Sequence, residues 1–500
     1  MAGKEALSFM RTSGILMHIS SLPSPGGIGS LGDEAYAFAD FLQASGIRIW
    51  QVLPVGPTGY GESPYQSSSV FAGNPLLISC QRLREEGLLQ YDDSEEFVPE
   101  NPETIEFDAV RKNKEMLLRR CYKQSAASLS GQIREFISVN PWVEDFALFT
   151  AVKNHFNQVM WTSWPDEGIR FRRPEAIRKY TEELRDDIDY HIFCQYIFRR
   201  QWFDLKKYCN DRSIRLFGDM PIYVAEDSAD TWTHPEIFQL DRELIPKKVA
   251  GVPPDYFSED GQLWGNPLYR WTYLRFCRKF DWWVARMRGM AELYDMIRID
   301  HFIGFANYYS VKHGMPNARE GKWVIGPGKA LFKRLNQEVP GIQIIAEDLG
   351  CVNNRVRRLL NWCGYPGMKV LTFGFDSDET NPHHPDNYGN NSVAYTGTHD
   401  NDTTRGWADR ADPKVLDYAG KLLGFSKPED APEAFIRFLF RGPCDTVIIP
   451  MQDILGLDNS ARMNYPGTIG GNWRWRMKPD QLSLSLSMKY YRLNKETNRR

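Results

Sequence analysis

Eight short runs of apolar and β-branched residues are spread along this chain of 500 residues. Several of the runs are apolar throughout, which is typical of parallel strands buried on both faces. Helical or loop-rich stretches separate most of them, and this alternation predicts an α/β fold, a (β/α)8 TIM barrel. An open doubly wound sheet is the alternative. The runs cover residues 14–19, 47–53, 214–221, 295–300, 342–347, 369–375, 392–398 and 445–451.

Two gaps in this series are too long for simple loops, so we expect one barrel over residues 1–500 with inserted, mainly helical subdomains. The first insertion, residues 67–213, falls between the second and third runs. Its helical patterns cover 141–158, 173–186 and 188–207. The second, residues 222–272, is irregular and rich in Pro, Gly and aromatic side chains.

Charge and composition narrow the class of partner. The formal net charge is only −3, so no basic surface is expected to attract nucleic acid or an anionic membrane. Aromatic residues reach 13%, with 15 Trp. These rings fit either a large core or a cleft lined with rings for sugars, and composition leaves both open. We expect a small or neutral partner.

The eight cysteines are scattered, without a C-x-x-C pair. This pattern favours buried, inert thiols in a reducing compartment over a disulfide framework or a zinc site. No segment approaches 18 apolar residues, and the N-terminus has no signal-peptide pattern. The expected location is the cytoplasm, or an organelle lumen if a transit peptide has been removed.

Three of the predicted strands end in motifs with carboxylates, the first in residues 296–302, MIRIDHF. Side chains alternate along a strand, so Arg298 and Asp300 share one face. The arginine should keep the carboxylate ionised and oriented, as a nucleophile requires. A salt bridge at a strand end, without catalytic role, is the alternative.

The second motif, residues 342–350, places Glu347 and Asp348 at another strand end. The two side chains should point to opposite sides, so only one can enter a shared cleft. A buried glutamate has a raised pKa, which suits a general acid. Alternatively, Asp348 caps a helix and Glu347 is incidental.

The third motif, residues 395–403, reads YTGTHDNDT and contains His399 and Asp400. So many polar groups must bond each other or a ligand. A polar turn with Asp400 as a helix cap is the alternative. We expect no metal, because no second histidine stands at ligand spacing.

The barrel would bring Asp300, Glu347 and Asp400 to one rim. Retaining glycoside chemistry needs one carboxylate to attack the anomeric carbon and another to protonate the leaving oxygen. A third carboxylate can hold sugar hydroxyls.

These motifs and further ordered blocks closely resemble the amylomaltases, also called 4-α-glucanotransferases or disproportionating enzymes. The blocks are 20–25 (SSLPSP), 51–54 (QVLP), 56–61 (GPTGYG), 63–66 (SPYQ), 218–222 (GDMPI), 225–228 (AEDS), 249–255 (VAGVPPD), 263–267 (LWGNP) and 472–476 (NWRWR). The resemblance implies a retaining 4-α-glucanotransferase with Asp300 as nucleophile, Glu347 as general acid/base and Asp400 as transition-state stabiliser.

The resemblance also implies binding residues and a lid. The implied substrate-binding residues are Tyr60, Asp219, Trp264, Arg298 and His399. The implied lid, residues 249–257, includes Gly251, Pro253, Pro254 and Asp255. The chain departs from the family at Ile303, where Arg is common, and at Tyr309, where Trp is common.

The expected partners are an α-1,4-glucan donor and a sugar acceptor, glucose or a maltooligosaccharide, with no cofactor; monomer or homo-oligomer stays undecided. An α-glucan hydrolase of the α-amylase type is the nearest alternative. A non-catalytic glycan-binding protein is more distant, since all three carboxylates are present. Residues 27–32 fit G-x-G-x-x-G, but the second predicted strand lacks the acidic residue that would bind a ribose, so we expect no dinucleotide site.

Overall fold

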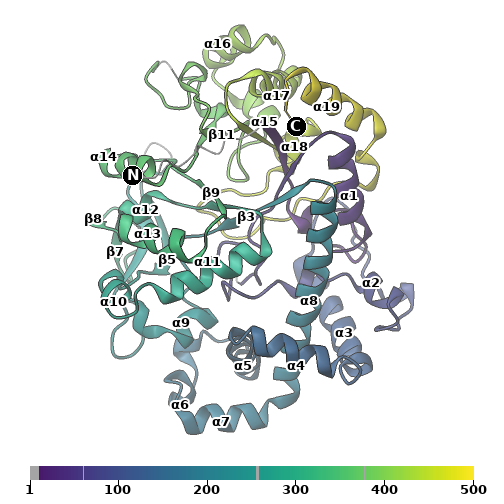
Figure 1. Ribbon diagram of the computed structural model, residues 1–500, viewed down its shortest axis with the longest axis vertical. Helices are drawn as coiled ribbons and strands as arrows, with labels where there is room; N and C mark the ends of the chain where they lie inside the picture. Colours follow the sequence, from purple (N-terminus) through teal and green to yellow (C-terminus); the bar gives the residue numbers. More distant parts are fainter. Residues whose placement is uncertain (1–10, 60, 255–257, 377, 500) are drawn as a thin grey trace.

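The computed structural model describes residues 11–59, 61–254, 258–376 and 378–499, and within them the strands form two sheets (Figure 1). One sheet has eight parallel strands and the other has four antiparallel strands. The parallel sheet gathers all eight runs that the sequence predicts as strands. The antiparallel sheet is not predicted by the sequence pattern.

The eight parallel strands form a barrel. In barrel order they are β10 (Gly367–Val370), β11 (Ser392–Tyr395), β12 (Thr446–Pro450), β1 (Thr12–Leu16), β2 (Ile49–Gln51), β3 (Arg215–Met220), β6 (Met296–Ile299) and β9 (Gln343–Ala346). The order in space follows the order in the chain, and the last strand meets the first where the Ala346 amide donates to the Pro366 carbonyl at 2.9 Å. The (β/α)8 barrel is therefore confirmed, and the open doubly wound sheet is wrong.

Burial explains why these segments become barrel strands. All five residues of β1 and all five of β12 are buried, as expected for strands covered on both faces. Gly14 lets the strands approach, because a Cβ there would lie 2.4 Å from Ile448 Cδ1. The run predicted at 369–375 is misplaced: β10 ends at Val370 and a 3-10 helix, Leu371–Phe373, follows.

Helices surround the barrel and continue beyond it at one end (Figure 1). Those outside the long β2–β3 connection are α1 (Asp33–Ala44), α9 (Ala229–Thr233), α10 (Trp271–Phe276), α11 (Asp281–Leu293), α12 (Ile303–Ala306), α13 (Lys329–Glu338), α14 (Asn354–Cys363), α15 (Thr404–Arg410), α16 (Pro413–Leu423), α17 (Ala431–Arg441), α18 (Met451–Ile454) and α19 (Leu484–Glu496).

The connection between β2 and β3 holds seven helices within the described residues. They are α2 (Cys80–Glu85), α3 (Phe107–Ser125), α4 (Ser130–Val139), α5 (Trp142–His155), α6 (Glu167–Arg170), α7 (Pro174–Glu183) and α8 (Arg185–Asp211). The long α8 packs against α1 and β3 as well as against α5, so it belongs to the barrel wall and to the connection at once.

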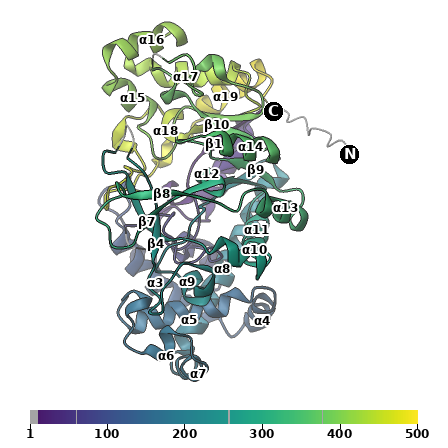
Figure 2. The same cartoon turned by 90° about the vertical axis from the view of Figure 1, so that its left-hand side faces the viewer.

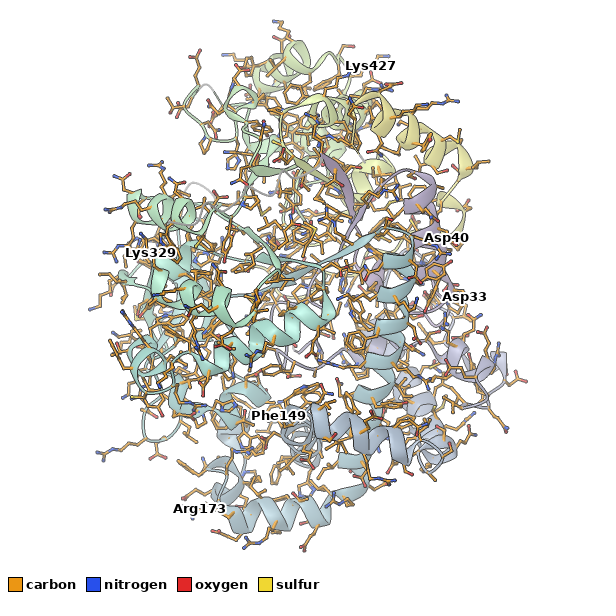
Figure 3. All side chains as sticks on the ribbon, viewed as in Figure 1. Asp33, Asp40, Phe149, Arg173, Lys329 and Lys427 are labelled. Atoms are coloured by element: carbon orange, nitrogen blue, oxygen red, sulfur yellow. The ribbon has the colours of Figure 1, made fainter. Side chains whose placement is uncertain are left out.

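A separate aromatic core fills this helical region. Phe149 of α5 lies 5.7 Å from Trp164 and 5.8 Å from Trp232, between ring centroids. Figure 3 shows Phe149 inside the helices below the barrel, whereas Arg173, Lys329 and Lys427 lie at the periphery. Trp232 comes from α9, so the residues after β3 help to close the core of the β2–β3 connection.

The antiparallel sheet joins two segments that are distant in sequence. Its strands, in order, are β5 (Gln262–Pro267), β4 (Lys248–Val252), β7 (Asn307–Lys312) and β8 (Gly321–Ile325). Figure 2 shows β4, β7 and β8 between the inserted helices and the α15–α17 end of the molecule. The irregular stretch 222–272 is therefore partly a sheet, completed by residues that follow β6.

The tryptophans lie both in the core and at the barrel rim. Trp50, Trp202 and Trp283 are among the largest fully buried side chains, whereas Trp264 lies beside the barrel rim. None of the eight cysteines, all of which lie in the described residues, forms a disulfide; six are buried as expected, but Cys277 and Cys351 are exposed. Among the described residues, no helix is long and apolar enough to span a membrane.

Candidate active site

Asp300 stands directly after β6 and contacts the arginine two residues before it. Arg298 Nη2 donates to Asp300 Oδ1 at 2.8 Å, the contact that strand alternation predicts. Burial raises the pKa of Asp300 to about 6, and the charge of Arg298 opposes this shift without cancelling it. Asp300 is therefore ionised at neutral pH, although less readily than a carboxylate in water.

Arg298 also joins a second strand to this centre. Asp219 is the register partner of Arg298 on the neighbouring strand β3, and its Oδ2 lies 2.7 Å from Arg298 Nη2. The Tyr65 hydroxyl donates to the same oxygen at 2.7 Å. The Tyr65 ring stacks on His399, with centroids 5.1 Å apart and planes 15° apart. Tyr65 thus connects the β3–β6 side of the rim to the β11 side.

Glu347 stands at the end of β9, directly beside Asp300. Ile299 and Ala346 are register partners, so the next residues, Asp300 and Glu347, leave two neighbouring strands at one level. Such strands lie about 4.8 Å apart. The backbone amide of His301 donates to Glu347 Oε2 and that of Leu349 donates to Oε1, both at 2.7 Å. The two carboxylates therefore share one corner of the rim.

The pKa of Glu347 is raised to about 8 by burial first and by the charge of Asp300 second. The two backbone amides favour the charged form and oppose this shift without reversing it. Near neutral pH the corner therefore holds a protonated Glu347 next to an ionised Asp300. That is the pair of states required by an acid and a nucleophile.

Asp348 points away from this corner, as predicted. Its Oδ1 accepts a hydrogen bond from the Met368 amide at 2.7 Å, which ties β9 to β10. Gly367 makes room for this carboxylate, because a Cβ there would lie 2.5 Å from Asp348 Oδ2. Helix α14 is capped by Asn353, so the alternative in which Asp348 caps a helix is wrong.

Asp400 lies in the loop after β11 and is held by side chains. Asn464 Nδ2 donates to Asp400 Oδ1 at 2.7 Å, and His399 Nε2 lies 3.4 Å from Asp400 Oδ2. Burial alone would raise the pKa of Asp400, but His399 and Asn464 together lower it to about 2. Helix α15 is capped by Thr403, so Asp400 is not a helix cap.

The loop that carries Asp400 is fixed by an arginine from a distant segment. Arg462 Nη2 donates to the Asp400 carbonyl at 2.6 Å, and its Nη1 pairs with Asp402. The backbone N–H of Asn464 donates to the His399 carbonyl at 3.1 Å. Residues 462–464 therefore set the position of Asp400 through both its backbone and its side chain.

Trp264 of β5 brings the antiparallel sheet to the rim. Its ring packs edge to face on His301, with centroids 4.8 Å apart and planes at 86°. Tyr223 lies on another side of it, at 6.1 Å. An indole beside the acid corner is a suitable surface for the apolar face of a sugar.

The structure brings some of the predicted site residues together and leaves others apart or undescribed. It brings together Asp219, Arg298, Asp300, Glu347, His399 and Asp400, with Trp264 beside them. Tyr60 and Asp255 lie outside the described residues. Gly251 lies in β4, where a Cβ would be 2.5 Å from the Gln262 carbonyl, and Pro253 and Pro254 follow the end of that strand. Ile303, one of the two departures from the family pattern, is buried in α12.

Four residues of the site are absent from the sequence prediction. They are Tyr65, His301, Arg462 and Asn464. Tyr65 falls within the SPYQ block and His301 directly follows Asp300, so a nearby motif could have indicated both. No motif in the sequence analysis lies near Arg462 or Asn464. Within the described ranges, no group of three His, Cys, Asp or Glu side chains is arranged to hold a metal ion.

Sequence comparisons match almost the whole chain. A family model described as 4-alpha-glucanotransferase matches residues 17–483. The 4-alpha-glucanotransferase of Clostridium butyricum is 44% identical over 96% of this chain and 99% of its own length. The 4-alpha-glucanotransferase of Thermus thermophilus is 43% identical over 95% of this chain and 96% of its own length.

Solved structures give the same result at the level of the fold. The amylomaltase from Streptococcus agalactiae, in complex with acarbose, matches with a TM-score of 0.95 and 40% identity, over 98% of this chain and 99% of that chain. The amylomaltase from Corynebacterium glutamicum matches with a TM-score of 0.76 over 98% of this chain and 75% of that chain. At 18% identity it supports the fold alone.

Proposed function

This chain belongs to the 4-α-glucanotransferase family, and we propose that it moves segments of α-1,4-glucan from a donor to an acceptor sugar by a retaining double displacement. The observation that carries the residue roles is the corner shared by Asp300 and Glu347, in which one carboxyl is ionised and its neighbour is protonated. Retaining enzymes place these two groups about 5–5.5 Å apart, which adjacent strand ends at one level can provide.

In the first step, the ionised Asp300 attacks the anomeric carbon of the donor glucan. The bond from that carbon to the glycosidic oxygen breaks, and Glu347 gives its proton to this oxygen. The leaving chain departs with a free 4-hydroxyl. Asp300 now carries the glycosyl group as an ester, and Glu347 is a carboxylate.

In the second step, the 4-hydroxyl of the acceptor sugar replaces the leaving chain. Glu347 takes its proton, the hydroxyl oxygen attacks the anomeric carbon, and the ester bond to Asp300 breaks. Glu347 is then protonated and Asp300 ionised, as at the start. Two inversions give net retention of the α configuration.

Asp400 has a different role, because its surroundings keep it charged. Positive charge develops at the anomeric carbon in both transition states, and a fixed carboxylate on the same rim stabilises it. Asn464 and His399 occupy the Asp400 oxygens while Arg462 holds its backbone. Arg298, bound to both Asp219 and Asp300, orients the nucleophile.

Sugar binding is assigned to groups around this corner. Asp219 Oδ1 has no hydrogen-bond partner in the described part of the chain although the residue is buried, so a sugar hydroxyl is its natural partner. Trp264 offers a ring face, and Tyr65 adds a further aromatic group. The lid over residues 249–257 stays a prediction, as does the role of Tyr60.

A hydrolase would use the same carboxylates with water as the second acceptor. The two activities are separated by incubating the pure protein with maltotriose and analysing the products. We expect glucose together with a ladder of maltooligosaccharides longer than maltotriose. Only maltose and glucose, with no longer product at any time, would contradict transfer.

A further inference from the structure

Asp453 is a buried carboxylate behind the loop that carries Asp400, and the steps described above do not use it. It lies on α18, directly after β12, and is 2% exposed. Burial raises the pKa of Asp453, and the groups that oppose this shift are the neutral Thr396 and Thr404 rather than a cation. Burying a carboxylate without a cation is costly, so the bonds that hold Asp453 require an explanation.

These bonds join the two ends of the Asp400 loop. Thr396, the residue after β11, donates its hydroxyl to Asp453 Oδ2. Thr404, the first residue of α15, donates its backbone N–H to Asp453 Oδ1 at 2.7 Å and its hydroxyl to Oδ2 at 2.8 Å. Both threonines are fully buried, at 0% exposure. One carboxylate therefore closes residues 397–403 between the end of β11 and the start of α15.

Capping of α15 does not account for this arrangement. Thr403 already caps the helix, because its hydroxyl accepts from the Gly406 N–H at 3.0 Å. The N–H of Thr403 is in turn bonded to Asn459 Oδ1 at 3.1 Å. The bond from Thr396 comes from the other end of the loop, and no helix cap requires it.

Within the loop, local hydrogen bonds connect these fixed ends to Asp400. The N–H and the hydroxyl of Thr398 both donate to Asn401 Oδ1, at 2.8 and 2.9 Å. The Asp400 N–H donates to the Thr398 hydroxyl at 3.3 Å. The loop is thus a bonded turn, and a shift at either end displaces the Asp400 carboxylate.

Helix α18 also supports the segment that holds the middle of the loop. Arg462 bonds the Asp400 carbonyl, and Gln452, the residue before Asp453, donates from Nε2 to the Ala461 carbonyl at 3.3 Å. Two neighbouring residues of α18 therefore reach Asp400 by separate routes. Gln452 supports the residues that bond Asp400, whereas Asp453 fixes the ends of its loop.

We propose that Asp453 is a positioning residue for Asp400, and that by fixing both ends of residues 397–403 it keeps the Asp400 carboxylate where both transition states need it. This inference rests on the proposed function, because it needs Asp400 to act on the sugar. Asp453 lies behind the loop and acts only through Asp400.

A double-mutant cycle with Asp400 tests this inference. Asp453→Ala removes all three bonds. Asp453→Asn keeps the shape, and its amide can donate to both threonine hydroxyls, which then accept. Both changes are made in the wild type and in Asp400→Asn, and kcat and KM are measured with maltotriose and with maltosyl fluoride. The matched control is Asp230→Ala, because Asp230 is a 4% exposed carboxylate of the inserted helical core that accepts from the Val70 N–H at 2.9 Å.

We expect Asp453→Ala to lower kcat about 10- to 100-fold with both donors, and to change KM less, because Asp400 acts in both transition states. In the Asp400→Asn background the same change should lower kcat less than about threefold. Asp453→Asn should restore most of kcat. Asp230→Ala should lower the melting temperature, and any change that it makes in kcat should be the same in both backgrounds.

An equal loss of kcat from Asp453→Ala in both backgrounds would overturn the inference, as would a variant that melts lower but keeps the wild-type kcat. Thr396→Val removes a single bond and gives the same test if Asp453→Ala does not fold. Its loss of kcat should vanish in the Asp400→Asn background and should be absent in Thr396→Ser, which keeps the hydroxyl; any other pattern overturns the inference. A wild-type protein that makes no ladder from maltotriose would instead refute the proposed function.

Discussion

Two parts of the same rim hold their carboxylates in opposite ways. At the β6–β9 corner, Glu347 accepts hydrogen bonds from two backbone amides, and burial raises its pKa to about 8. In the loop after β11, Asp400 is bonded by Asn464 and lies beside His399, and its pKa falls to about 2. Burial acts on both groups in the same direction, so the partners decide the outcome.

One barrel rim can therefore keep one acid protonated and another charged at the same pH. The backbone amides of His301 and Leu349 hold Glu347 in place but leave its proton on. The side chains of the adjacent His399 and of Asn464 from a distant segment keep the proton off Asp400. The pKa of Asp300 is intermediate, about 6, because burial raises it and the charge of Arg298 lowers it.

Removing the nucleophile should have the largest effect. Asp300→Asn keeps the shape of the side chain but cannot form the glycosyl ester. We expect transfer from maltotriose to fall on the order of 10⁴-fold. Activity within about tenfold of the wild type would remove Asp300 from its proposed role. Circular dichroism of the variant checks that the fold is intact.

Replacing the acid should have a large effect that depends on the donor. In Glu347→Gln no proton reaches the glycosidic oxygen, so transfer from natural glucans should fall about 10²- to 10⁴-fold. Fluoride leaves without a proton, so the first step with maltosyl fluoride should fall much less, as stopped-flow fluoride release can measure. Equal losses with both donors would contradict the acid role.

The pH profile of kcat/KM should show two limbs that belong to the coupled Asp300–Glu347 pair. Activity should fall below about pH 6, where Asp300 gains a proton, and above about pH 8, where Glu347 loses one. Each limb should approach a tenfold loss per pH unit. In Glu347→Gln with maltosyl fluoride, the first-step profile should keep the acidic limb and lose the basic one. A wild-type profile that stays flat beyond pH 9 would contradict the raised pKa of Glu347.

The smallest expected effects are opposite shifts in thermal stability. Between about pH 4.5 and 8 folded Glu347 retains a proton that the unfolded chain has lost, so the wild type loses stability as pH rises through this window. Glu347→Gln removes this loss and should melt a few degrees higher than the wild type at pH 8. The gap should narrow towards pH 5.

Asp400→Asn should shift stability the other way. The pKa of Asp400 lies below its ordinary value of 3.8, so its charge stabilises the fold above that pH and the effect disappears as pH falls through about 2. The variant should therefore melt below the wild type at pH 7, with the gap closing in acid. Scanning calorimetry measures both shifts in melting temperature. Shifts of the same sign in the two variants would contradict the opposite pKa shifts of Glu347 and Asp400.

The barrel and its three acids could be predicted from sequence for a physical reason. Parallel strands buried on both faces need continuous apolar runs, and such runs stand out, as in β12. The chain then turns at the strand end, where Asp300 and Glu347 follow at once. Alternation along the strand also predicts the contact between Arg298 and Asp300.

The rest depends on contacts that leave no local signal. The antiparallel sheet pairs β4 and β5 with strands that follow β6, and the edge strand β8 is largely exposed, so it lacks an apolar run. Tyr65 is 154 residues from Asp219, and Asn464 is 64 residues from Asp400. The left-handed backbone of His301 has no sequence marker, because only glycine announces that conformation.

The central claim is that Asp300 forms a covalent bond to the glycosyl group while Glu347 controls its formation and release. Glu347→Gln incubated with maltosyl fluoride tests it directly, because fluoride departs without an acid and no base remains to activate an acceptor. Mass spectrometry of the intact protein and of its peptides should find one maltosyl group, attached to Asp300. Fluoride release that leaves no adduct on any peptide during turnover, or an adduct on another residue, would contradict the account.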